Sequence, residues 1–356
     1  MLCSFEESAE LYEDISSIQT RDYFSSFDEK RAQFSNPAEM LIGGEEERFV
    51  RLCSDESGLP FEKMSDYERF AAFVNNWLCF AGSGVAEVFA EKVRLFTEED
   101  IDSYYISPQA LWTLCCEKMS FAENGLDTLG AEKGKSIRLP RLCGCVSYTE
   151  LLERNFEALD GADEETAVIA DISDVEFLRS DKFHCEEAFS AFSEDGVSGR
   201  DMLVSGLLYS LCEKMKKRNI RLWLNIGGNY SFAEKLIKYF SGRGVLPSIR
   251  VFASGDCIVR AARGLCGEYP SGSSRVKVLC GVLYECGDTS DLIADKIKKI
   301  AAVYPLKLLR FGGTDTNEPL FAAHHRVFAK GLYLALHDIC GDCGEALGIA
   351  RAVLEN

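Results

Sequence analysis

The sequence is short of basic residues. Its 356 residues include 39 lysines and arginines against 57 aspartates and glutamates, which gives a formal net charge of −18. Nucleic acids and anionic membranes bind proteins through basic surfaces, so this balance argues against both kinds of partner. We therefore expect no nucleic acid and no membrane among the partners.

The sequence also lacks a long apolar segment. The apolar run from Met202 to Cys212 is shorter than the about 20 residues that a transmembrane helix needs. The first residues, Met-Leu-Cys-Ser-Phe-Glu-Glu, lack the basic and apolar regions of a secretory signal peptide. These absences predict a cytoplasmic protein.

Histidine is scarce, and its placement is uneven. Only four histidines occur, and two of them, His324 and His325, are adjacent and within ten residues of Asp315. An apolar segment at 306–312 reads as a strand, and the residues from 320 onward have helical spacing. A strand that enters a helix through Gly-Gly-Thr-Asp places Asp315 at the carboxyl end of a sheet, where α/β folds carry their chemistry.

Cysteine, by contrast, is abundant. The 15 cysteines are odd in number, scattered and mostly inside apolar runs, which is typical of free thiols in a reducing compartment. Two close pairs stand out, Cys143-Gly-Cys145 and Cys340-Gly-Asp-Cys343. Each supplies half of the four ligands of a structural zinc, so we favour incidental spacing over a metal site.

Strand-like and helix-like segments alternate along most of the chain, which predicts an α/β protein with a parallel sheet. Composition alone does not separate a barrel from an open doubly wound sheet. Residues 36–124 have helical patterns throughout, including a capping box that begins at Ser65. The expected strands are 18–23, 137–142, 166–171, 220–226, 248–253, 276–281 and 306–312.

The C-terminal stretch resembles a known family. Thr314-Asp315-Thr316 is followed by residues at fixed spacing: His325, Phe328 and Leu332. This pattern resembles the last strand and helix of bacterial uronate (glucuronate) isomerases, TIM-barrel members of the amidohydrolase superfamily. Their pattern is Thr-Asp-Ser-Arg and then Arg-His-x-x-Phe-x-x-x-Leu. In this chain Asn317 and His324 replace the two arginines.

The first expected strand carries the same resemblance. Its Asp-Tyr-Phe-Ser-Ser-Phe at 22–27 is similar to the family's Asp-Tyr-His-x-His-Leu, and Leu-Ile-Gly-Gly at 41–44 to a later Leu-Gly-Gly. Phe24 and Ser26 thus replace two metal-binding histidines. The other positions where the resemblance places histidines lie near Ala86 and Phe89, and at Ile172 and Asn225.

The resemblance extends through nearly the whole chain and implies a TIM-like (β/α)8 barrel. The family's Thr-Thr-Asp-Asp turn is missing from residues 125–145, so we expect a barrel that is distorted or lacks a strand. The predicted organisation is a single TIM-barrel domain, 1–356, with 36–124 as a helical insertion after the first strand.

The resemblance also implies a reaction, the aldose–ketose isomerisation of hexuronates of the glucuronate-to-fructuronate type. Such a reaction needs a base, an electrophile at the carbonyl oxygen and a cationic clamp for the carboxylate. The family holds a divalent metal such as zinc on the first-strand histidines and the last-strand aspartate, of which only Asp315 remains. We therefore predict no metal site, no cofactor, and weak or no isomerase activity. The alternative is a non-catalytic barrel that binds a sugar acid or has a regulatory role.

Six residues are candidates for a site. Asp315 and His325 are the catalytic candidates, and the substrate-binding candidates are His324, Asn225, Asp171 and Arg310. A small sugar acid is the expected partner, and a homo-oligomer is compatible with the sequence.

Each candidate has a structural alternative. Asp315 is equally suited to cap a helix. His324 is better explained as an exposed helix residue than as a clamp, because neutral imidazole binds carboxylate less well than guanidinium. Asp171 and Asn225 suit strand-end solvation or turn formation equally well, and Arg310 faces either the barrel mouth or the outer helices.

Overall fold

The computed structural model describes most of the chain. The described residues are 5–18, 20–22, 36–42, 46–47, 49–51, 60–76, 82–98, 107–121, 131–133, 135–163, 166–178, 184–253, 257–267, 276–278, 288–309 and 318–355. Asp315 and Arg310 lie outside them, as do Phe24 and Ser26.

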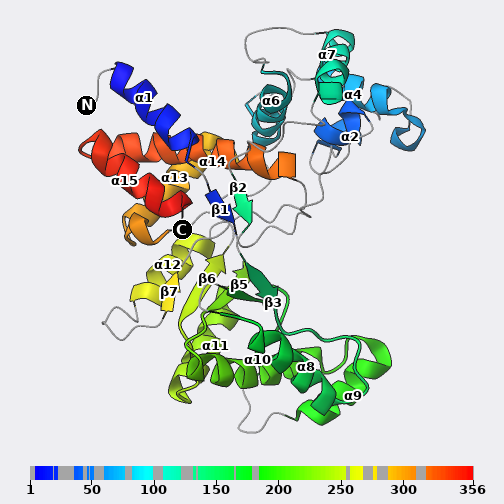
Figure 1. Ribbon diagram of the computed structural model, residues 1–356, viewed down its shortest axis with the longest axis vertical. Helices are drawn as coiled ribbons and strands as arrows, with labels where there is room; N and C mark the ends of the chain where they lie inside the picture. The colour runs from blue at the N-terminus through cyan, green and yellow to red at the C-terminus, as the bar shows by residue number, and fades with distance from the viewer. Residues whose placement is uncertain are drawn as a thin grey trace.

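A parallel sheet of five strands, with helices around it, forms the lower part of the molecule in Figure 1. Its order follows the sequence, and its strands are β3 Ser136–Arg138, β4 Ala167–Asp171, β5 Leu222–Gly227, β6 Ile249–Ala253 and β7 Val276–Val278. A separate parallel pair joins β1 Thr20–Asp22 to β2 Ala131–Lys133. The predicted α/β class with parallel strands is confirmed, whereas closure into a barrel stays a prediction.

The expected strand at 306–312 is wrong for its first half. Residues Leu306–Leu308 form the 3₁₀ helix η5, and the Leu309 amide donates to the Leu306 carbonyl at 2.8 Å. Leu306 and Leu309 are buried, and residues three apart lie on the same side of a 3₁₀ turn. One 3₁₀ turn therefore buries both leucines. The apolar sequence is compatible with this turn as well as with a strand. Residues 310–312 lie outside the described part.

The two faces of the sheet bury different side chains. One face contributes Val168, Ala170, Leu222 and Leu224 to the main apolar core, together with residues of the helices on that side. The other face buries a small cluster, Ala167, Ile169, Trp223 and Phe252. The near-continuous burial of β4 and β5 is typical of parallel strands covered on both sides.

The helices that connect successive strands along the chain cover the sheet (Figure 1). They are α8 Tyr148–Asp160, α9 Cys185–Asp195, α10 Arg200–Lys217, α11 Tyr230–Gly242 and α12 Cys257–Gly267. The last turn of α10 carries three lysines, and the Arg218 guanidinium that follows donates to the Leu159 and Ala162 carbonyls at 2.8 and 3.1 Å. Arg218 therefore joins the end of α10 to the end of α8.

A second group of helices packs beside the sheet. It consists of α1 Phe5–Ser16, α13 Ser290–Ala301, α14 Glu318–Ile339 and α15 Cys343–Leu354, and in it the first helix of the chain contacts the last two (Figure 1). Among the described residues no helix is long and apolar enough to cross a bilayer.

The predicted helical segment has an apolar core of its own. It contains α2 Pro37–Leu41, η1 Phe61–Lys63, α4 Asp66–Asn75, α6 Gly84–Thr97 and α7 Pro108–Phe121. Ser65 and Glu68 form the predicted capping box of α4. Inside this core Lys92 donates to Glu46 at 2.6 Å, and both side chains are almost fully buried. The assignment of 36–124 as an insertion within one barrel domain stays a prediction.

Helix α6 ties this helical segment to the rest of the molecule. Glu87 accepts hydrogen bonds from the Ser290 amide at 2.8 Å and from Lys330 at 2.9 Å. Ser290 begins α13 and Lys330 is on α14, so one carboxylate holds three helices together.

We predict that Gly331→Ala destabilises the protein. A Cβ at Gly331 would lie 2.7 Å from Ile293 Cγ2 and 2.8 Å from the Ser290 carbonyl, because α13 and α14 approach closely there. Overpacking of this kind costs about 1–3 kcal/mol of unfolding free energy, measurable by urea denaturation. Gly348→Ala in α15 is the matched control, since its Cβ meets nothing within 4 Å. That control should be neutral or stabilising, and equal effects of the two variants would contradict the prediction.

Candidate functional site

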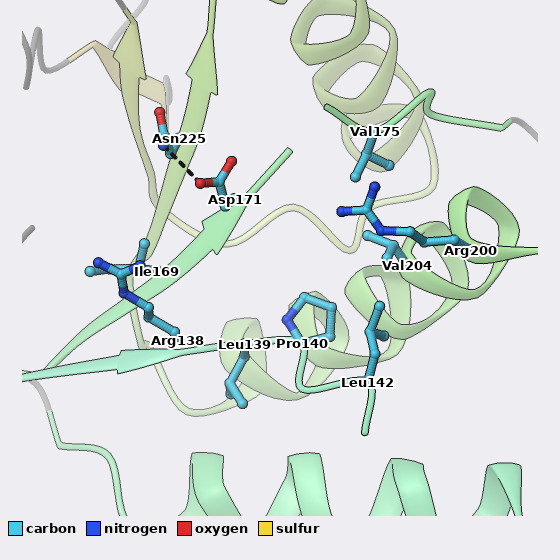
Figure 2. Close-up of a pocket in the computed structure, with 10 residues that line it drawn as sticks. All are labelled: Arg138, Leu139, Pro140, Leu142, Ile169, Asp171, Val175, Arg200, Val204 and Asn225. Carbon is cyan, nitrogen blue, oxygen red and sulfur yellow. Dashed lines mark hydrogen bonds between the residues drawn. The ribbon is translucent and has the colours of Figure 1, made fainter. Parts of the chain in front are cut away.

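Two of the predicted site residues meet at the carboxyl edge of the sheet. Asp171 ends β4, and the parallel register pairs it with Asn225 of β5. The Asn225 Nδ2 atom donates to Asp171 Oδ2 at 3.0 Å (Figure 2). Because their strands are neighbours in register, both side chains lie on the sheet face that also carries Ile169 and Trp223.

The same two residues also shape the turns that follow their strands. Asp171 Oδ1 accepts from the Ser173 amide at 3.0 Å and from its hydroxyl at 2.6 Å, and Asn225 Oδ1 accepts from the Gly227 amide at 3.2 Å. Gly227 has φ of +50°, and a Cβ there would lie 2.9 Å from Ser173 Cβ. Turn formation and presentation to a ligand are therefore compatible, because the carboxylate and amide are held in place by the turns.

Two arginines line the same cavity as Asp171 and Asn225. Arg138 is the last residue of β3 and Arg200 the first of α10, and the cavity has a volume of about 370 Å³. Figure 2 shows the two guanidinium groups on either side of Asp171. Arg200 also pairs with Asp174 at 2.9 Å. The rest of the wall is largely apolar: Leu139, Pro140, Leu142, Ile169, Val175 and Val204.

Sequence reasoning missed both arginines. Arg138 was placed inside an expected strand 137–142, but β3 ends at Arg138, two residues before Pro140. Proline has no amide hydrogen for a strand ladder, so Pro140 was a signal for the earlier end. No sequence feature places the Arg200 side chain near β3 and β4.

The two adjacent histidines are both buried in α14. His324 is 5% exposed and His325 is 6% exposed, so the interpretation of His324 as an exposed helix residue is wrong. Burial disfavours the imidazolium ion, and with the nearby Arg326 charge it lowers the pKa of His325 to about 4. His325 is therefore neutral at pH 7.

The side chains present do not fit the divalent metal of the resembled family. Within the described part of the chain, no three histidine, cysteine, aspartate or glutamate residues come together in a way that could hold an ion. Ile172 is 2% exposed and apolar, and the Asn225 amide is used by Asp171. The two positively charged guanidinium groups at the cavity also repel a metal cation. We derive no chemistry through a metal at this edge.

We predict that protein purified without added metal contains no stoichiometric zinc. The reason is the donor set, because a catalytic zinc needs three protein ligands and Phe24 and Ser26 offer none. Elemental analysis of the purified protein checks this. One zinc per chain, lost in Asp315→Ala, would contradict it.

The chain has an α/β fold in which the carboxyl ends of parallel strands meet at one polar edge, and α/β folds as a class bind ligands at such edges. The solved structures similar to this chain include a particular family within that class. Uronate isomerase from Thermotoga maritima has a TM-score of 0.76 at 12% identity, over 99% of this chain and 96% of that chain. Glucuronate isomerase from Caulobacter crescentus has a TM-score of 0.63 at 12% identity, over 98% and 92%. A uronate isomerase from Bacillus halodurans has a TM-score of 0.59 at 11% identity, over 99% and 96%.

The resemblance to the uronate isomerases is thus confirmed at the level of the fold. No protein-family model matches the sequence, and no curated protein is similar to it.

Proposed function

We propose that the cavity at the carboxyl edge binds a small sugar acid, and that the protein is uronate isomerase-like with weak or no isomerase activity. The observation that carries the proposal is that two guanidinium groups line the same cavity as a hydrogen-bonded carboxylate and amide. We further propose a distorted TIM-like barrel as its architecture and the cytoplasm as its location.

The charges of the cavity match the groups of a hexuronate. A guanidinium is the side chain best suited to a carboxylate, because its planar donors pair with both oxygens. The Asp171 carboxylate and Asn225 amide offer acceptors and donors for sugar hydroxyls. A volume of about 370 Å³ falls in the usual range for small-molecule sites, roughly 300–1,000 Å³.

The same contacts favour binding over catalysis. Asp171 is the carboxylate in the cavity, and it accepts three hydrogen bonds from Ser173 and Asn225. These bonds fix the carboxylate in place and leave about one of its four lone pairs, on Oδ2, to accept a hydrogen bond from a sugar hydroxyl. Asp171 is therefore better placed to position a hydroxyl group than to move a proton between two carbons.

Non-catalytic binding of a sugar acid is the second candidate. It is favoured by the residues at the positions where the resemblance places histidines: Ile172 is a buried apolar residue, and Asn225 has no titratable group. Direct assay of turnover separates the two candidates.

We predict that Arg200→Ala weakens glucuronate binding about 10- to 100-fold. Hydrogen bonds to charged groups are worth about 1.5–3 kcal/mol, and each 1.4 kcal/mol is tenfold in Kd. Isothermal titration calorimetry with glucuronate and galacturonate measures the loss of affinity. Glucose, which has no carboxylate, serves as the neutral control ligand. Arg263→Ala, an exposed arginine of α12, is the matched control and should leave Kd unchanged.

A second variant tests the sign of the effect. Asp174 pairs with Arg200 at 2.9 Å and competes with an anionic ligand for it, so Asp174→Asn should tighten binding. Undetectable binding by the unmodified protein, or equal losses in Arg200→Ala and Arg263→Ala, would overturn the assignment of the cavity.

A further inference from the structure

The segment between β3 and α8 carries two thiols that directly follow a residue of the cavity wall. Leu142 lines the cavity, and Cys143-Gly144-Cys145 follows it directly. Cys143 is exposed and Cys145 is half-buried against the apolar cluster of α8, α9 and α10. Both thiols are therefore at or near the surface, one in solvent and one behind it.

The chain is fixed on both sides of this pair. Before it, the buried Asn155 side chain accepts from the Arg141 amide at 2.8 Å and donates to its carbonyl at 3.0 Å. After it, the Val146 amide donates to Glu150 at 2.9 Å, and Arg154 pairs with Glu150 at 2.7 Å. The Arg154 guanidinium also donates to the Gly144 carbonyl. The pair thus sits in a defined turn.

The turn brings the second thiol back over the first residue. Gly144 has φ of +83°, a conformation that L side chains rarely adopt. Cys145 Sγ lies 4.0 Å from the Cys143 carbonyl oxygen. Two residues separated by one other have Cα atoms at most about 7 Å apart, and disulfides span about 4.4–6.8 Å between Cα atoms. A disulfide across Gly144 needs only a local adjustment of the turn.

The other described cysteines offer no such pair. Burial raises the pKa of Cys115 to about 12 and also raises the pKa of Cys212, and a thiol that stays protonated does not attack disulfides. Cys116 is exposed, but its neighbour is that buried Cys115. Cys340 is a buried free thiol and Cys343 is disulfide-bonded, so these two do not form a dithiol or half of a zinc site.

We propose that Cys143 and Cys145 form a thiol–disulfide exchange site for small-molecule disulfides. The Cys143 thiolate attacks one sulfur of the disulfide, the S–S bond breaks, and one thiol leaves with the proton lost by Cys143. The Cys145 thiolate then attacks Cys143 Sγ and forms the Cys143–Cys145 bond. The second thiol leaves with the proton lost by Cys145. One disulfide is reduced to two thiols, and the protein dithiol is oxidised.

Glutathione disulfide is the probe for the test. The reduced full-length protein is incubated with it, alkylated and mapped by mass spectrometry. We expect a peptide that contains both cysteines to lose two hydrogens and to resist alkylation until reduced. Cys143→Ser should abolish this product. Cys145→Ser should instead retain a stable mixed disulfide with glutathione on Cys143, because no second thiol displaces it. Cys116→Ser, an exposed cysteine away from the pair, should react like the unmodified protein.

Three results would overturn the proposal. They are free alkylation of both cysteines after incubation, a mixed disulfide on Cys143 that persists in the unmodified protein, or a bond from either residue to a different cysteine. Sugar-acid binding is not needed for any of these readouts, so the test stands apart from the proposed function.

Discussion

Purified protein is expected to isomerise glucuronate or galacturonate at least about a hundred- to a thousand-fold more slowly than an ordinary enzyme, whose turnover is roughly 1–1,000 per second. Removal of one group that stabilises a developing oxyanion commonly costs about 3–4 kcal/mol, which is that factor in rate. Here Phe24 and Ser26 replace the histidines that the resemblance assigns to the electrophile. His325, the residue that keeps its family position, is buried and neutral.

The assay follows ketose formation from each hexuronate, with and without added zinc or manganese. The assay with added metal distinguishes a site that binds metal weakly from one that lacks metal ligands, because only the weak site gains activity. Turnover in the ordinary range that is abolished by Asp315→Asn would contradict the prediction and show that Asp315 is a catalytic residue. Turnover abolished by Asp171→Asn but not by Asp315→Asn would instead place the chemistry in the described cavity.

The residues of the site that could be predicted from the sequence are those at the ends of strands. Asp171 and Asn225 each close an apolar run, and carboxyl ends of parallel strands meet at one edge, so their proximity follows from local pattern. Arg200 comes from a helix start 29 residues after Asp171 along the chain, and its distance to the cavity depends on how α10 packs. Tertiary packing of this kind leaves no periodic signal in the sequence.

For the fold as well, features set by local sequence were predictable, and features set by tertiary packing were not. Strands β4, β5 and β6 lie where continuous apolar runs predicted them, because buried parallel strands must be apolar on both faces. Leu306, Leu308 and Leu309 give the next apolar segment a similar pattern, but Leu306–Leu308 forms a 3₁₀ turn. Short apolar runs do not distinguish a strand from a buried helical turn, since both hide the same side chains. Strand β2 was missed because only three residues, Ala131–Lys133, pair with β1.

Acidification from pH 7 to pH 4.5 is expected to destabilise the protein through His325. Its pKa is lowered to about 4 in the fold, chiefly by burial and also by Arg326, and it returns to about 6.5 on unfolding. Between these values the unfolded chain binds more protons than the folded one. Stability therefore rises with pH in this window and is fully present only above the unfolded pKa. The full difference of about 2.5 pKa units corresponds to roughly 3 kcal/mol.

Urea denaturation at several pH values between 4.5 and 7 measures this contribution. The carboxylate of Asp163, whose pKa is lowered to about 2 by Lys135 and Thr166, changes stability mainly below this window, so the histidine dominates the comparison of variants. His325→Leu should flatten the slope of unfolding free energy against pH, whatever it does to stability at pH 7. Val327→Ala, a buried and non-titrating neighbour on α14, should lower stability at every pH and keep the slope. A slope that stays the same in His325→Leu would show that His325 gains water or an anionic partner in solution, and that its pKa there is close to that of an exposed imidazole.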